Sequence, residues 1–111
     1  MVSSQMLKGV LEGCILKIIS AKQTYGYEIS EELNEYGFSK ISEGTIYPIL
    51  LRLEKNNAIS AEYKDSPHGP KRKYFSITPS GEAELRTFIH CWQELNNAIS
   101  ALFENEGEIN E

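Results

Sequence analysis

Cysteine is scarce in this chain, and long apolar runs are missing from it. The sequence holds only two cysteines, Cys14 and Cys91, each inside an apolar helical pattern. Isolated cysteines of this kind fit buried thiols in a reducing cytoplasm better than a disulfide framework. The sequence has no run of roughly 18 apolar residues and no secretory leader, which argues against membrane insertion and export. We therefore expect a cytoplasmic protein with a single core and no membrane partner.

Residues that carry catalysis or bind metals are also few. The two histidines, His68 and His90, lie in a Pro- and Gly-rich segment and in a helical pattern, respectively. Since His90 and Cys91 are neighbours on a helix, their side chains point about 100° apart and do not form a nucleophile pair. The cysteines and histidines lack metal-ligand spacing, and the sequence has no Gly-rich phosphate loop. These absences predict a protein that is not an enzyme and uses no cofactor or metal.

Positive charge is in the minority but is concentrated in one place. The formal net charge is −5, which by itself argues against a nucleic-acid partner. Residues 1–37 hold 3 basic and 5 acidic side chains, residues 38–77 hold 7 and 4, and residues 78–111 hold 1 and 7. The middle third is therefore the basic part of the chain.

The central segment, residues 42–57, predicts a helix with two different faces. Ser42 is suited to cap its first turn, and Pro48 should bend it without ending it. An apolar stripe at helical spacing should enter a core, namely Ile46, Ile49, Leu50 and Leu53. The opposite face combines small residues, hydroxyls and cations, which suit a phosphate-lined groove as well as an ordinary solvated helix face: Gly44, Thr45, Tyr47, Pro48, Arg52 and Lys55.

A first helix is predicted over residues 4–21. Its apolar stripe, from Leu7 to Ile19, is wide enough to contact two other helices. Gly9 and Gly13 stand four residues apart and lower helix propensity, so we expect another helix to pass close to both.

A second helix is predicted over residues 25–36, with Thr24 as its N-cap and Gly37 as its C-terminal stop. Its inward residues would be Ile29, Leu33 and Tyr36. A short connection leads to the central helix, so the two helices stand in the order of a helix-turn-helix.

The period changes from helical to alternating after the central helix. Residues 59–64 and 73–77 alternate apolar and polar side chains, which predicts a two-stranded ribbon. Residues 65–72 between them are rich in Pro and Gly and end in cations, so we expect a loop there. A hairpin with a basic tip after a helix-turn-helix is a wing.

A long final helix is predicted over residues 79–104, with Thr78 as N-cap and Pro79 at the first position. Its apolar seam repeats every three or four residues over roughly 40 Å, more than one small core covers, so we expect it to meet a second copy. The sequence thus predicts a mainly α fold with a small β-hairpin (α+β). It is divided into a winged-helix domain over residues 1–78, a dimerisation helix over 79–104 and an acidic, frayed tail over 105–111.

Four stretches in series resemble the PadR-like transcriptional regulators, specifically the short subgroup with one C-terminal helix. They are Leu-Lys-Gly at 7–9, Tyr-Gly-Tyr-Glu-Ile at 25–29, Gly-Thr-Ile-Tyr-Pro-Ile-Leu at 44–50 with Leu-Glu at 53–54, and Gly-Pro-Lys-Arg-Lys-Tyr-Phe-Ser-Ile-Thr-Pro-Ser-Gly at 69–81. The resemblance implies a winged-helix homodimer that binds operator DNA, usually as a repressor, with a recognition helix at 43–56.

Residues suited to contact double-stranded DNA come from that helix and the wing. Thr45 and Tyr47 have hydroxyls for phosphates or base edges, while Arg52 and Lys55 are better placed for phosphates. Two alternatives stay open: Tyr47 packs under the first helix, and Lys73 faces solvent. The full set of expected DNA contacts is Gly44, Thr45, Tyr47, Pro48, Arg52, Lys55, Lys71, Arg72 and Lys73.

The expected dimer interface follows the seam and the first helix: Leu11, Leu85, Phe88, Trp92, Leu95, Ile99 and Leu102. Trp92 is either a large packing residue or part of an apolar cleft that accepts a planar aromatic effector, lined by Leu11, Ile15, Phe88 and Trp92. Two other functions compete with DNA binding. They are a winged-helix module that contacts another protein, and a small-molecule-binding dimer.

Overall fold

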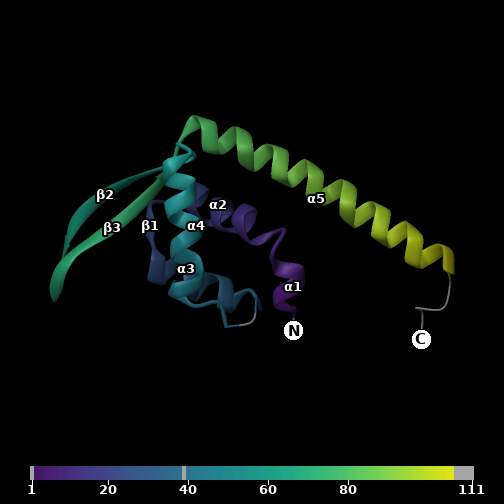
Figure 1. Ribbon diagram of the computed structural model, residues 1–111, viewed down its shortest axis with the longest axis horizontal. Helices are drawn as coiled ribbons and strands as arrows, with labels where there is room; N and C mark the ends of the chain where they lie inside the picture. Colours follow the sequence, from purple (N-terminus) through teal and green to yellow (C-terminus); the bar gives the residue numbers. More distant parts are fainter. Residues whose placement is uncertain (1, 39, 107–111) are drawn as a thin grey trace.

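The computed structural model describes residues 2–38 and 40–106, and within them the chain is mainly helical with a small sheet. Two features project from opposite sides of a helical body, namely a β-hairpin and the second half of the last helix (Figure 1). The principal extents are 55 × 28 × 20 Å. The predicted α+β fold class is confirmed by the element order: α1 (Ser4–Leu7), α2 (Leu11–Ala21), β1 (Thr24–Tyr25), α3 (Gly26–Glu35), α4 (Glu43–Lys55), β2 (Ile59–Ser66), β3 (Gly69–Ile77) and α5 (Pro79–Glu106).

The predicted first helix is two helices, α1 and α2, because the chain turns at residues 8–10. Gly9 lies in this turn, and a Cβ placed on it would meet nothing within 4 Å. The expectation of a close helix at Gly9 is therefore wrong. At Gly13 the same expectation is right, because an added Cβ would overlap the ring of Phe88 from α5.

The start of α3 also differs from the prediction. Thr24 does not cap the helix but belongs to β1, where it pairs with Phe75 of β3. Its hydroxyl donates to Glu28 Oε1 at 2.8 Å, and Tyr25 is the residue in the N-cap position. The far end is as expected at Gly37, whose φ of +100° ends the helix. Tyr36, expected to face inward, is 75% exposed because it sits at the C-cap.

Helix α4 matches its predicted start and core face. The Ser42 hydroxyl accepts a hydrogen bond from the backbone N–H of Thr45 at 3.3 Å, as an N-cap does. The helix continues through Pro48 to Lys55, and Ile46, Leu50 and Leu53 have no exposed surface. Side chains of α3 fix its approach, since the Ser30 hydroxyl donates to the carbonyl of Ile41 and the Ile41 N–H donates to Asn34. Helices α3 and α4 thus form the expected helix-turn-helix.

The sheet has three antiparallel strands in the order β1-β3-β2. The prediction of a loop over residues 65–72 is wrong, because β2 and β3 extend the ladder and leave only Pro67 and His68 between them. Gly69, at a φ of +149°, supplies the backbone conformation of the tight turn. The inner end of the hairpin enters the core through Ile59 and Phe75, while the outer end projects as a ribbon (Figure 1).

Helix α5 begins at Pro79 as expected, with the Gly81 N–H donating to the Thr78 hydroxyl at 3.0 Å. It runs to Glu106, two residues beyond the predicted end, and residues 107–111 of the expected frayed tail lie outside the described residues. In the described residues, its contacts with the body of the protein come from its first turns, where Leu85 is buried and the Phe88 ring lies against Gly13. In the described part of the chain, no helix is both long and apolar enough to span a membrane.

The two thiols are free and differ in exposure. Cys14 in α2 is half-buried, and burial raises its pKa. Cys91 in α5 is exposed in the single chain, so the expectation of a buried thiol is wrong there.

Candidate nucleic-acid interface

The face of α4 that points away from the core forms one continuous strip. Four exposed residues repeat at steps of four, three and four along it: Gly44, Pro48, Leu51 and Lys55. Thr45 and Arg52 flank the strip towards α2, and Tyr47 flanks it towards the sheet. With two residues that lack long side chains and one cation at its end, the strip allows close approach to a flat or grooved polyanion.

Arg52 is partly held by the neighbouring helix. Its guanidinium lies 3.3 Å from the Glu12 carboxylate of α2, and their side chains are 54% and 37% exposed. An ion pair this exposed stabilises the fold by only about 0–1 kcal/mol. The guanidinium is therefore oriented beside the strip and remains accessible from solvent.

Tyr47 does not pack under the first helix, so that alternative is wrong. Its side chain is 47% exposed and lines a groove where the starts of α3 and α4 meet β3. Tyr27 lines the same groove from α3 and is 53% exposed. The negative charge of Glu31 and a hydrogen bond to it raise the pKa of the Tyr27 hydroxyl.

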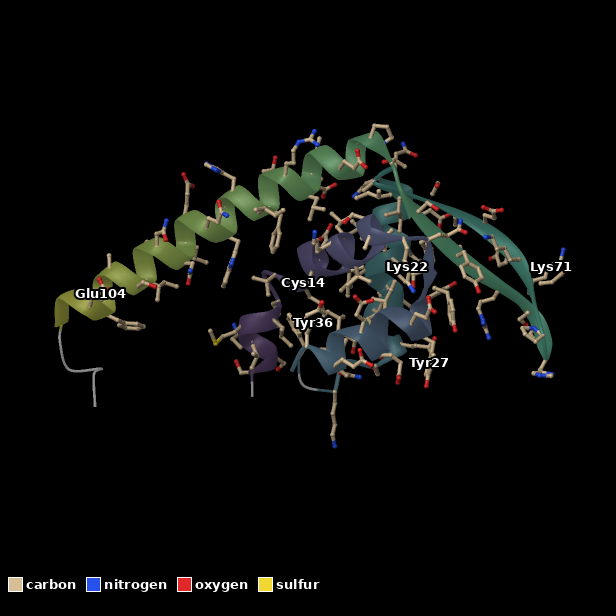
Figure 2. All side chains as sticks on the ribbon, turned by 180° about the vertical axis from the view of Figure 1, so that it is seen from behind. Cys14, Lys22, Tyr27, Tyr36, Lys71 and Glu104 are labelled. Carbon is tan, nitrogen blue, oxygen red and sulfur yellow. The ribbon has the colours of Figure 1, made fainter. Side chains whose placement is uncertain are left out.

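The wing carries three consecutive cations in different environments. Lys71 is exposed towards the far end of the hairpin (Figure 2). Arg72 lies over the Tyr25 ring, 4.2 Å from its centroid, and a hydrogen bond to Tyr74 raises its pKa. The Tyr25 and Tyr74 rings meet edge to face at 5.1 Å, so Arg72 is part of a small stack that joins the wing to β1.

Lys73 neither faces solvent nor lies at the wing tip. Its ammonium is 2.9 Å from the Glu54 carboxylate at the end of α4, and its side chain is 17% exposed. The hydrogen bond to Glu54 raises the pKa of Lys73. The alternative in which Lys73 simply faces solvent is therefore wrong. Its charge holds the base of the wing against the expected recognition helix.

Sequence reasoning missed two exposed residues at this surface, Leu51 and Tyr27. Leu51 is 45% exposed, and its place could have been found by extending the step from Pro48 to Lys55 along the helix. Tyr27 had no such signal, because the groove that contains it is formed only when α3, α4 and β3 come together.

The residues expected to form the dimer interface and effector cleft fall into two groups. Leu11, Ile15 and Leu85 are 6%, 0% and 8% exposed and belong to the core of the single chain. Ile15 has no surface to offer a ligand, so its expected role in the effector cleft is wrong. The four outer residues of the seam are 42–58% exposed, namely Trp92, Leu95, Ile99 and Leu102. Phe88 is half-buried, with its ring against Gly13.

Helices α3 and α4, the three-stranded sheet and its projecting hairpin define a winged helix-turn-helix protein. The chain belongs to the PadR-like transcriptional regulator family, whose family model matches residues 15–87. Members of this family are transcriptional regulators rather than enzymes. Within the described residues, no three His, Cys, Asp or Glu side chains gather in a way that could hold a metal ion.

Known proteins similar to this chain include both sequences and solved structures. A PadR-like transcriptional regulator of Bacillus cereus is 51% identical, with a TM-score of 0.81 over 90% of this chain and 97% of that one. A transcriptional regulator of Mycobacterium tuberculosis is 31% identical over 85 residues, which cover 77% of this chain and 78% of that protein. Bacillus subtilis PadR in complex with operator DNA is 25% identical, with a TM-score of 0.67 over 75% of this chain and 48% of that one.

Proposed function

We propose that this protein is a homodimeric repressor that binds double-stranded operator DNA sequence-specifically. The observation that carries the proposal is the exposed strip of α4, flanked by Arg52 and by the groove that contains Tyr47. The helix has 13 residues and is roughly 20 Å long, and an α-helix fits the major groove of B-DNA. The operator complex of the similar Bacillus subtilis PadR supports the same use of this fold.

The wing would contact the DNA backbone beside the groove. Lys71 is an exposed cation near its tip, and Arg72 is oriented by its stack on Tyr25. Phosphate contacts of this kind carry affinity without sequence information. Lys55, at the end of the α4 strip, would have the corresponding role on the helix, while Thr45 and Tyr47 would contact base edges.

The acidic net charge does not oppose this proposal, because most of the acidic residues lie outside the basic middle third. Glu28, Glu31, Glu32 and Glu35 lie on α3, and residues 78–111 hold 7 acidic side chains against 1 basic. DNA would meet the middle third, where 7 basic side chains outnumber 4 acidic ones, and dissolved salt weakens repulsion from the more distant carboxylates.

Dimerisation is proposed through α5. Four large apolar side chains, Trp92, Leu95, Ile99 and Leu102, are at least 42% exposed along one seam of a helix that leaves the body of the chain. An apolar seam exposed to water is unfavourable in a monomer. Packing against a second copy related by a two-fold axis would bury this seam. Two recognition helices so related would meet an inverted repeat in major grooves roughly 34 Å apart.

A planar aromatic effector is proposed at the centre of that dimer. With Ile15 excluded and Leu11 buried, the proposal rests on Phe88 and Trp92, whose rings lie one turn apart on α5. Such a ligand would release DNA only if it bound the DNA-competent arrangement less well than another one. Quenching of Trp92 fluorescence by planar aromatic dyes, measured together with DNA release, tests this. No quenching across a varied panel would leave Trp92 a purely packing residue.

The proposed function is tested by titrating the DNA upstream of the protein's own gene with purified protein and measuring binding by fluorescence anisotropy. We expect specific binding that Lys71→Gln weakens and that Arg86→Gln, an equal loss of charge on α5, leaves unchanged. A competing function, a winged-helix module that contacts another protein, predicts no DNA binding at any salt concentration and no difference between the two variants.

A further inference from the structure

The exposed strip of α4 is apolar at its centre. Pro48 and Leu51 lie one turn apart on it, and Leu51 is 45% exposed. The core does not need this leucine, because Ile46, Leu50 and Leu53 already fill the inner face with no exposed surface. A single exposed leucine on a protein surface is common. The position of this one is unusual, because it lies between the Thr45 hydroxyl and the Lys55 ammonium on the face proposed to enter DNA.

The major groove offers one apolar group to such a residue. Each base edge there presents hydrogen-bond donors and acceptors, and only thymine adds a methyl group, at C5. Neither Pro48 nor Leu51 has a polar side-chain atom, so neither side chain reads a base by hydrogen bonding. Their contact with a base edge is favourable only where both surfaces are apolar, since a polar edge packed against Leu51 would lose its water without gaining a partner.

We propose that Leu51, together with Pro48, recognises thymine in the operator by packing against its C5-methyl group. This inference rests on the proposed function, because it assigns a base preference to the helix that would enter the groove. Each half-site would then contain at least one thymine whose methyl group faces the middle of α4. The polar flanks at Thr45, Tyr47 and Arg52 would contact the neighbouring bases and phosphates.

The test replaces thymine by deoxyuridine, which keeps every hydrogen-bonding group and lacks only the methyl group. The operator is first selected from random DNA by the wild-type protein, and each thymine of a half-site is then exchanged in turn. Burying one methyl group is worth about a four-fold change in affinity. We therefore expect deoxyuridine at one or two positions to weaken wild-type binding by about that factor, and no effect elsewhere in the site.

Variants of Leu51 assign the methyl effect to this residue. Leu51→Ala should abolish most of the sensitivity to deoxyuridine, while Leu51→Met, which keeps an apolar side chain, should retain it. Leu51→Gln should shift the selected base at the same position towards adenine, which glutamine recognises by two hydrogen bonds. Alanine, methionine and glutamine are all good helix formers, and position 51 is exposed, so the circular dichroism spectrum of the three variants should match that of the wild type.

Two results would overturn the inference. One is wild-type binding that ignores deoxyuridine at every position, and the other is a Leu51→Ala variant with undiminished sensitivity. Either result leaves the proposed DNA binding intact, because binding itself is still observed. Failure to bind any DNA would instead overturn the proposed function, and the thymine contact with it.

Discussion

Lys71 and Lys73 are two cations on the same strand that lie in different environments. Lys71 is exposed near the wing tip, whereas Lys73 is 17% exposed and bonded to Glu54. We predict that Lys71→Gln weakens DNA binding several-fold without changing stability. Lys73→Gln should weaken DNA binding less than Lys71→Gln does. It should lower the free energy of unfolding by about 0.5–1 kcal/mol, because the substitution removes a partly buried ion pair. Anisotropy titrations and urea unfolding of both variants measure the two effects, and the reverse pattern would contradict the assignment.

The Lys73 contact also predicts a pH dependence. Its pKa is raised in the folded protein, so the contact stabilises the fold fully below the ordinary lysine pKa of about 10.4. That contribution is lost as pH rises through the higher pKa of the folded state. The difference in unfolding free energy between wild type and Lys73→Gln should therefore be constant from about pH 7 to pH 9 and shrink in more alkaline solution. A difference that grows with pH would show that another group is responsible.

Prediction from sequence succeeded for residues whose partners are close along the chain. Ser42 and Thr78 cap helices three residues ahead, so their roles follow from local spacing alone. It failed for Thr24 and Lys73, whose roles depend on pairing with Phe75 and on contact with Glu54. Tertiary contacts of this kind leave no periodic signal in the sequence.

At the scale of elements, the start of α5 is fixed to the corner between α4 and β2. The Thr78 hydroxyl donates to the Asn57 carbonyl at 2.6 Å, and a Cβ on Gly81 would overlap the carbonyl of Ala58. The orientation of α5 relative to α4 is therefore set by contacts that Thr78 and Gly81 make with the backbone of this corner. These contacts leave no room for a larger residue at position 81.

We predict that Gly81→Ala lowers the free energy of unfolding by about 1–3 kcal/mol, because the backbone at Ala58 must move to admit the new methyl group. Gly9→Ala is the matched control. Nothing lies within 4 Å of a Cβ there, so the change should be neutral or slightly stabilising. Thermal and urea unfolding distinguish the two, and equal effects at both positions would contradict the close packing at Gly81.

The predicted elements were right in kind and order but wrong at several ends. Periodicity identified α3, α4, the hairpin and α5, because each has an apolar face of its own. It missed β1, which has only two residues, and the turn at residues 8–10, which interrupts a continuous apolar stripe. Pro and Gly suggested a long loop in the hairpin, yet pairing between the strands extends through that region. Strand pairing is a non-local property that composition does not reveal.

At the scale of the whole molecule, the exposed seam of α5 predicts the assembly. We expect a solution mass of twice the 12.6 kDa chain, and Leu95→Glu should give monomers because it places a charge in the apolar interface. Asn97→Glu adds the same charge on the opposite side of the helix and should leave the dimer intact. Sedimentation equilibrium measures both. A wild-type monomer at micromolar concentration with an intact helical spectrum would refute the dimer.

The salt dependence of binding is the sharpest test of whether α4 and the wing bind DNA. Wild-type protein is titrated with its own upstream DNA and with an unrelated sequence between 50 and 200 mM salt, values over which protein–DNA affinity typically changes by orders of magnitude. We predict tighter binding to the upstream DNA than to the unrelated sequence. The logarithm of the affinity should fall steeply and linearly with the logarithm of the salt concentration, and in Lys71→Gln the slope should be smaller by about 1, the value of one lost phosphate contact. Equal and weak binding to both sequences, or a salt slope unchanged by Lys71→Gln and Lys55→Gln together, would show that α4 and the wing do not bind DNA in this way.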